Sequence, residues 1–254
     1  MLLEGKKGLV LNVLNKNSIA WAIADAANLQ GATVGMGVQN ERLLDGALKL
    51  IEGRERFDPF LIDFSDQTQF DSLAEQVAEK YGKIDFLVHS VGFAPKEAMT
   101  GRFIDTTLED YQTAMAISAF SLGRLCQVME PLLNEDASVI TLSYLGSTRA
   151  LRNYNVMGVC KAALESTVRY LAVELGDRGI RVNTLSPGPV NTVAGRGVSG
   201  LTDMIKIVHD RAPLKRPYGK EEVATSAVYL LSDLSKGVTG QIIFIDSGYT
   251  VVGM

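Results

Sequence analysis

The chain has 254 residues, of which 46% are hydrophobic and 21% charged, a composition that excludes a disordered protein and suits one large or two small globular domains. The net charge of −4, with no long basic block, argues against binding to nucleic acid. The first residues, MLLEGKKGLV, lack the pattern of a signal peptide, and no apolar run approaches 18 residues. We therefore expect a cytoplasmic protein that does not enter the membrane and acts on small molecules.

Short apolar runs alternate along the whole chain with longer runs of helical period. This alternation is typical of repeated βα units, and the near-continuous apolar runs are typical of parallel strands covered on both faces. We therefore predict an α/β fold with a parallel sheet. The expected strands are residues 8–14, 32–38, 60–64, 85–91, 138–143, 181–186 and 241–246.

The first expected helix follows the first strand, with Ser18 as its N-cap and Gly31 marking its end. Ile19, Ile23 and Ala27 recur at helical spacing within it. Further helices are expected near residues 67–81, 108–129, 155–176 and 220–232.

Three residues with reactive side chains are interpreted as parts of the core. Cys126 and Cys160 lie in apolar stretches, without a C-x-x-C spacing or a clustered histidine, so we predict reduced packing residues and no metal site. His89 is alone in an apolar strand and is predicted to be a hydrogen-bonded core histidine rather than a catalytic base.

The turn after the first strand, NVLNKNSIAWAIA, lacks the G-x-G-x-x-G pattern of dinucleotide-binding proteins. The helix that begins after Ser18 nevertheless offers free N–H groups and the positive end of its dipole, so phosphate binding stays possible. At the end of the second strand, Gln39 could receive adenine or ribose, and Arg42 could pair with a 2′-phosphate or simply be solvated.

The ends of the third and fourth strands supply further candidates for a nucleotide site. Asp63 and Phe64 would border an adenine ring. Ser90 and Gly92 lie where backbone must pass close to ribose or nicotinamide, which glycine permits.

Tyr154 and Lys161 are seven residues apart in NYNVMGVCK. On a helix they would face the same way, about 10 Å apart. A nearby ammonium would favour ionisation of the phenol and sharpen it as a hydrogen-bond donor. The spacing alone is also common on amphipathic helices, so the pair carries little weight without the rest of the chain.

Residues 187–216 interrupt the alternation of strands and helices. A segment of this length in a compact α/β domain is usually functional, often a lid over a site, although a surface excursion is the alternative.

Several of these segments together resemble the bacterial enoyl-acyl-carrier-protein reductases of fatty acid synthesis. They are SIAWAIA, HSVGFAP, LSYLG, NYNVMGVCKAALESTVRYLAVELG, SPGPVNT and IDSGY. These enzymes form a divergent branch of the short-chain dehydrogenase/reductase superfamily, marked by a six-residue gap between tyrosine and lysine and by a second tyrosine ten positions earlier. Tyr154, Lys161 and Tyr144 match both marks.

The resemblance implies a single Rossmann-like, doubly wound domain over residues 1–254, with seven parallel strands and helices on both faces. The same resemblance implies an inserted substrate-binding loop and helix at about 187–216. It also implies reduction of the trans-2 double bond of an enoyl thioester on acyl carrier protein by NADH, in a homotetramer. NADPH is the less favoured cofactor.

The resemblance assigns catalysis to Tyr154, which would stabilise the enolate oxygen, with Tyr144 on the substrate side and Lys161 holding the nicotinamide ribose. The residues implied to contact the cofactor are Ser18, Ile19, Gln39, Asp63, Phe64, Ser90, Gly92, Lys161, Val190 and Thr192. Those implied to line an acyl channel are Met157, Ala194, Val198 and Met204.

The chain departs from the family at three positions where relatives commonly have glycine: Asn12, Ala22 and Ser247. Asparagine tolerates positive φ better than most residues, but its side chain could crowd a pyrophosphate. Two alternative functions stay open. One is a related short-chain reductase acting on enoyl-CoA or a carbonyl compound, and the other is a nucleotide-binding or structural protein without turnover.

Overall fold

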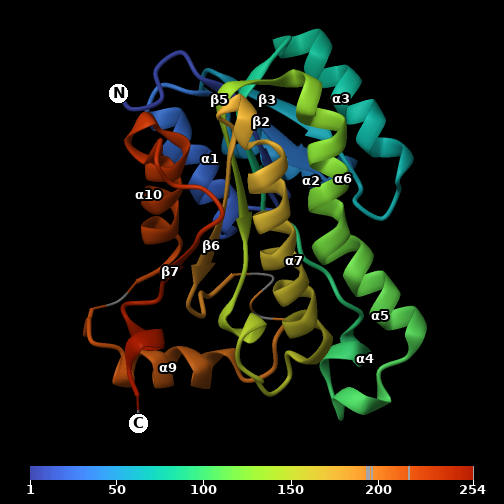
Figure 1. The fold of residues 1–254 in the computed structure, drawn as a ribbon, viewed down its shortest axis with the longest axis vertical. Helices are drawn as coiled ribbons and strands as arrows, with labels where there is room; N and C mark the ends of the chain where they lie inside the picture. The colour runs from blue at the N-terminus through green and yellow to red at the C-terminus, as the bar shows by residue number, and fades with distance from the viewer. Residues whose placement is uncertain (193–194, 196, 217, 254) are drawn as a thin grey trace.

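The computed structural model describes all residues except 193–194, 196, 217 and 254, and it contains a seven-stranded parallel sheet. The strand order is β3-β2-β1-β4-β5-β6-β7, with helices on both faces (Figure 1). This confirms the predicted doubly wound α/β fold. The strands are β1 Lys7–Leu11, β2 Thr33–Val38, β3 Phe57–Leu61, β4 Ile84–His89, β5 Leu133–Leu142, β6 Arg181–Pro187 and β7 Ile242–Ile245.

The helices include four that match the expected ranges closely and three others, the last of which lies within the 187–216 insertion, where the resemblance implies a helix. The first group is α1 Ile19–Leu29, α3 Thr68–Tyr81, α7 Asn155–Glu174 and α10 Lys220–Leu231. The second is α2 Glu41–Leu50, α4 Lys96–Met99 and α9 Leu201–Arg211. Short 3₁₀ turns occur at Phe103–Asp105, Glu130–Leu132, Leu145–Ser147, Gly176–Arg178, Asp233–Ser235 and Tyr249–Val251.

Two apolar cores lie on opposite faces of the sheet. Strand β1 shows the division, because Leu9 and Leu11 belong to one core and Val10 to the other. Helices α1, α2 and α10 cover the Val10 face, and α3 and α7 cover the opposite one. Burial on both faces explains why the strands read as continuous apolar runs.

The start of α1 is as the sequence predicts. The Ser18 hydroxyl oxygen accepts a hydrogen bond from the Trp21 backbone N–H at 3.1 Å, which is the N-cap contact. Gly31, with φ of 99°, follows the end of the helix.

The third strand begins three residues earlier than expected, at Phe57 rather than at residue 60. The difference arises at Pro59, which pairs with Met36 in the sheet. Proline lacks a backbone donor and argues against a strand interior, but β3 is an edge strand and needs partners on one side only.

The helix expected over 108–129 is divided by a π-helical turn. Helix α5 spans Leu108–Met115, the π turn Ala116–Phe120 and α6 Ser121–Met129. Ser118 in the π turn is buried, and its hydroxyl lies 2.8 Å from the Phe93 N–H and 2.7 Å from the Phe93 carbonyl oxygen. The widened turn therefore carries a contact between this helix and the segment after β4.

The core residues with reactive side chains lie as predicted. Cys126 and Cys160 are buried and free. His89 is fully buried, with its ring nitrogens 2.9 Å from Thr141 Oγ1 and 2.8 Å from Ser121 Oγ. Burial lowers the pKa of His89 to about 3, so it is neutral.

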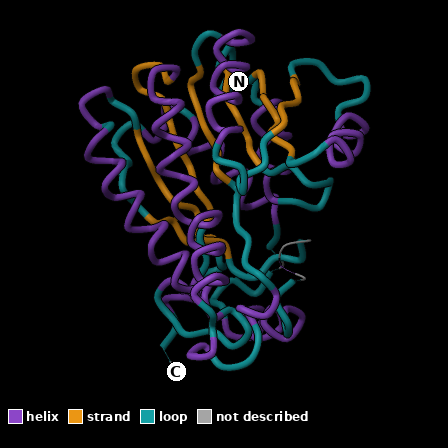
Figure 2. Tube along the Cα trace, turned by 90° about the vertical axis from the view of Figure 1, so that its right-hand side faces the viewer, coloured by secondary structure: helices purple, strands orange, loops and turns teal. Residues whose placement is uncertain are grey.

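The carboxyl ends of the strands meet at one end of the sheet, where α9 and the C-terminal residues also lie (Figures 1 and 2). Helix α9 belongs to the 187–216 segment that interrupts the sequence pattern. None of the helices in the described parts of the chain is both long enough and apolar enough to cross a membrane.

Candidate active site

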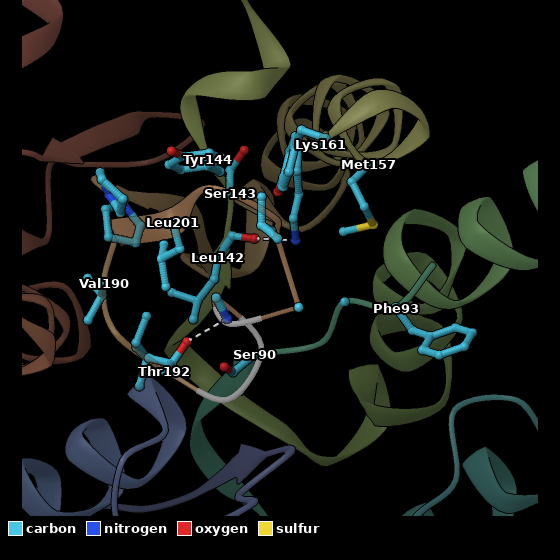
Figure 3. A pocket seen from close by; sticks show the side chains of 18 of the residues that line it. Ser90, Phe93, Leu142, Ser143, Tyr144, Met157, Lys161, Val190, Thr192 and Leu201 are labelled. Atoms are coloured by element: carbon cyan, nitrogen blue, oxygen red, sulfur yellow. Dashed lines mark hydrogen bonds between the residues drawn. The ribbon is translucent and has the colours of Figure 1, made fainter. Parts of the chain in front are cut away.

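A cavity of about 370 Å³ lies at the carboxyl ends of the strands, within the range of small-molecule sites. Its walls come from the β1–α1 turn, the segment after β4, the end of β5, the first turns of α7 and the segment after β6 (Figure 3). The structure brings twelve of the predicted site residues to it: Ser18, Ile19, Ser90, Gly92, Tyr144, Tyr154, Met157, Lys161, Val190, Thr192, Val198 and Met204.

Four predicted site residues are not among these. Gln39 and Asp63 lie away from the cavity and contact each other, with Gln39 Nε2 3.3 Å from Asp63 Oδ2. Phe64 is buried and packs edge-on against Phe70 and His89, so most of its ring contacts the core. Ala194 lies outside the described residues.

The two tyrosines meet at the cavity wall. Tyr154 is the N-cap residue of α7, and its ring lies edge-on to that of Tyr144, with centroids 5.1 Å apart. Only 7% of Tyr154 is exposed, and within the described residues no hydrogen-bond partner of its hydroxyl is found. The phenol is thus a donor at the cavity wall that a bound molecule can engage.

Burial determines the protonation state of the two tyrosines. Burial raises the pKa of Tyr154 well above its ordinary value, and burial raises that of Tyr144 to about 12. Desolvation therefore outweighs the influence of the Lys161 ammonium on the phenol, and Tyr154 keeps the proton that a hydrogen-bond donor needs. Both tyrosines are neutral donors near pH 7.

Lys161 is also buried, and its ammonium is held by backbone. Its Nζ donates to the Leu142 carbonyl oxygen at 2.8 Å (Figure 3) and to the Val91 carbonyl oxygen at 3.4 Å. An ammonium has three donors, so one remains for a ligand. Burial lowers the pKa of Lys161 to about 8, while Cys160 and Glu165 act in the opposite direction.

Two residues expected to line the acyl channel, Met157 and Met204, are in contact with hydroxyl groups through their sulfur atoms. The Tyr144 hydroxyl lies 3.9 Å from Met204 Sδ, and the Ser118 hydroxyl lies 3.6 Å from Met157 Sδ. Tyr144 and Met204 also line a second cavity of about 150 Å³ beside the first. The two cavities also share Pro187, Gly188 and Pro189, so the segment after β6 lies between them together with Tyr144 and Met204.

The start of α1 can hold a phosphate, although the glycine motif is absent. The Ser18 hydroxyl caps Trp21 and itself donates to the Asn15 carbonyl oxygen at 2.8 Å, so its hydrogen is already engaged. The N–H groups of Ile19 and Ala20 have no acceptor within an α-helix. Because Ile19 lines the cavity, a phosphate can reach these donors.

Asn12 occupies the turn where relatives commonly have glycine. Its φ is 65°, and its side-chain nitrogen donates to the Ser90 carbonyl oxygen at 2.9 Å. The residue thus adopts the left-handed backbone, and its amide is tied to the end of β4. With phosphate donors at one end and the Lys161 ammonium at the other, the cavity can take the phosphates and the nicotinamide half of a dinucleotide.

Sequence reasoning missed two buried residues beside the site. The Ser143 hydroxyl donates to Glu165 Oε1 at 2.5 Å. Ser143 directly precedes Tyr144, and Glu165 lies four residues after Lys161, on the same side of α7. The adjacency to Tyr144 and the helical spacing were the available signals.

Comparison with known proteins identifies similar chains. The sequence model of the family described as enoyl-(acyl carrier protein) reductase matches residues 13–250. The chain is 45% identical to an NADH enoyl-[acyl-carrier-protein] reductase of Synechocystis sp., covering 99% of each chain. It is 43% identical to a Rhizobium meliloti enzyme of the same description, covering 100% of this chain and 93% of the relative.

Solved structures agree with the sequence relatives. The enoyl-(acyl-carrier-protein) reductase of Anaplasma phagocytophilum, in complex with NAD, is 41% identical, with a TM-score of 0.94, and the match covers 100% of this chain and 95% of that one. The Bacillus cereus enzyme, in complex with NADP⁺ and indole naphthyridinone, is 38% identical with a TM-score of 0.96, covering 100% and 99%.

Proposed function

Since the chain belongs to the bacterial NADH-dependent enoyl-acyl-carrier-protein reductases, we propose that the cavity beside Tyr154 is its active site. The chain reduces the trans-2 double bond of enoyl-acyl-carrier-protein thioesters in fatty acid synthesis, with NADH as cofactor. The observation that supports this site best is the juxtaposition of Tyr144, Tyr154 and Lys161 around one cavity.

The cofactor would lie along the cavity from α1 to α7. The free N–H groups at Ile19 would hold a phosphate, and the remaining donor of Lys161 would bind the ribose hydroxyls of the nicotinamide half. Ser90, Gly92, Val190 and Thr192 would line its path, while the contact between Gln39 and Asp63 marks the place proposed for adenosine. When bound, NADH supplies the hydride that adds to C3 of the substrate.

Tyr154 would provide the electrostatic stabilisation. Its neutral phenol donates a hydrogen bond to the thioester carbonyl oxygen, which becomes the enolate oxygen as the reaction proceeds. A preorganised donor is worth more against the charged enolate than against the neutral carbonyl, so it lowers the barrier. Tyr144 supports the Tyr154 ring at 5.1 Å, and Met157, Val198, Met204 and Ala194 would line the acyl channel.

The wider arrangement is proposed on the family relationship. We propose one domain over residues 1–254, with 187–216 as the substrate-binding segment, in a cytoplasmic homotetramer. The exposed apolar side chains Phe120, Tyr170 and Val173 on the π turn and α7 support an interface between chains. NADPH stays the less favoured cofactor. Arg42, the residue that could pair with its 2′-phosphate, lies exposed at the start of α2.

The decisive measurement is NADH oxidation with crotonyl-carrier-protein and with crotonyl-CoA, in the wild type and in Tyr154→Phe. We expect the variant to lose about 10²- to 10³-fold in kcat and to keep its Kd for NADH. Absence of turnover with either thioester, despite NADH binding, would contradict the proposal. Turnover of crotonyl-CoA alone would favour the related reductase acting on coenzyme A thioesters.

A further inference from the structure

Two buried polar contacts fasten the end of β5 to α7. The Lys161 ammonium donates to the Leu142 carbonyl oxygen at 2.8 Å, and the Ser143 hydroxyl donates to Glu165 at 2.5 Å. Lys161 and Glu165 lie one helical turn apart, while Leu142 and Ser143 are consecutive and lead directly into Tyr144. Helix α7 therefore fixes the two residues before one of the site tyrosines.

Glu165 is a buried carboxyl group, which is costly unless it is compensated. Only 5% of Glu165, 5% of Ser143 and 6% of Lys161 are exposed. The Ser143 hydroxyl supplies a hydrogen bond, and the Lys161 ammonium on the same helix face supplies the opposite charge. Glu165 does not line the cavity, whereas Ser143 and Lys161 do.

The other titratable groups that act on Lys161 or are acted on by it are neutral near pH 7. His89 on β4 has its pKa lowered to about 3 by burial, and the Cys160 thiol on α7 has its pKa raised to about 11 by burial. Tyr154 keeps its proton for the same reason. Within the described residues, Glu165 is thus the buried acidic side chain that opposes the fall in the pKa of Lys161.

We infer that Glu165 is a positioning residue of the active site, which holds Tyr144 in place through Ser143 and keeps Lys161 charged for cofactor binding. The inference rests on the proposed function for the roles of Tyr144 and Lys161. Glu165 itself touches neither substrate nor cofactor, so its effect must pass through these neighbours.

The role through Lys161 has a pH signature that a purely structural residue lacks. The ammonium form of Lys161 binds the ribose, and burial brings its pKa to about 8 while Glu165 opposes that fall. NADH affinity should therefore decrease as pH rises through this pKa. Without the Glu165 charge the pKa falls further, so the decrease should begin at lower pH.

The experiment compares Glu165→Gln, Glu165→Asp and Ser143→Ala, with Glu174→Gln as a control for an exposed carboxylate on the same helix. The Kd for NADH, and kcat and KM for crotonyl-carrier-protein, are measured from about pH 6 to pH 9. Glu165→Gln keeps a hydrogen-bond acceptor for Ser143 and removes the charge. Glu165→Asp keeps the charge and shortens the reach to Ser143.

We expect Glu165→Gln to move the alkaline loss of NADH binding down by about one pH unit, while Glu165→Asp, Ser143→Ala and Glu174→Gln leave it in place. Glu165→Asp and Ser143→Ala should lower kcat about tenfold without changing the Kd for NADH, because Tyr144 loses its support. Glu174→Gln should match the wild type throughout.

An unchanged pH dependence in folded Glu165→Gln would overturn the inference, as would wild-type kcat in Ser143→Ala. If Glu165→Gln does not fold, the kcat values of Ser143→Ala and Glu165→Asp test the inference, which predicts that both are about tenfold below the wild type. A wild type that binds NADH but does not turn over would instead refute the proposed function, and the NADH titrations would still test the link between Glu165 and Lys161.

Discussion

At the level of single residues, two positions where relatives commonly have glycine keep the backbone that glycine favours. Asn12 has φ of 65° and Ser247 has φ of 58°. An L-residue in this region costs roughly 1–2 kcal/mol, less for asparagine. Asn12 gains a hydrogen bond to the Ser90 carbonyl oxygen. Among the described residues, the Ser247 side chain makes no hydrogen bond, and its backbone carbonyl accepts one from the Leu214 N–H.

Replacing each of these two residues by glycine should therefore distinguish the cost of backbone strain from the gain of the Asn12 hydrogen bond. Ser247→Gly should raise the free energy of unfolding by about 1 kcal/mol. Asn12→Gly should change it little, because relief of strain is offset by the lost hydrogen bond of about 1 kcal/mol. Denaturant titration of both variants measures this difference.

The same Asn12→Gly variant addresses the cofactor. We expect its Kd for NADH to be unchanged or lower, since the side chain contacts Ser90 rather than offering a donor to the phosphates. Weaker NADH binding in Asn12→Gly, with normal binding in Ser247→Gly, would show instead that the Asn12 amide contributes to the cofactor site.

At the level of elements, the irregular parts are those that the sequence predicted least well. Apolar residues recur at helical spacing throughout residues 108–129, and this pattern does not indicate the π turn at Ala116–Phe120. The apolar run at 60–64 did not indicate that β3 begins at Phe57 and includes Pro59, because a proline is tolerated there only through the edge position of β3, which depends on the order of strands. Both features follow from contacts between distant segments.

The π turn matters because Ser118 joins it to the wall of the cavity. The Ser118 hydroxyl contacts both the N–H and the carbonyl oxygen of Phe93, and Met157 lies beside it. Ser118→Ala removes the two hydrogen bonds to the Phe93 backbone, which costs about 1 kcal/mol for each bond. We expect a lower melting temperature and a higher KM for the enoyl thioester, since Phe93 lines the cavity.

Ser72→Ala on the exposed face of α3 is a suitable control, and we expect it to match the wild type. Thermal unfolding and steady-state kinetics of the two variants check the prediction. A Ser118→Ala variant with wild-type stability and KM would mean that the π turn does not support the site.

At the level of the whole molecule, sequence patterns were sufficient for the sheet and for most of the candidate site. Seven apolar runs with parallel connections require their carboxyl ends to meet at one edge, which placed Ser18 and Ser90 near one another. The family resemblance added Tyr144. Ser143 and Glu165 were missed, because a contact between buried side chains on a strand and a helix depends on packing that periodicity does not specify.

The outer surface of the molecule leads to the last prediction, which concerns assembly. On α7, 71% of Tyr170 and 80% of Val173 are exposed, and both face away from the sheet core. Burying such side chains against another chain would gain about 1.5–3 kcal/mol each, which supports an interface here. We therefore expect the double variant Tyr170→Asp, Val173→Asp to dissociate the proposed tetramer into smaller species, because charges inserted into an apolar interface cannot be solvated.

Light scattering after size-exclusion chromatography measures the molar mass, with Leu29→Asp at an exposed position on α1 as the matched control. A tetrameric double variant would place the interface elsewhere on the molecule, and a monomeric wild type would refute the tetramer itself.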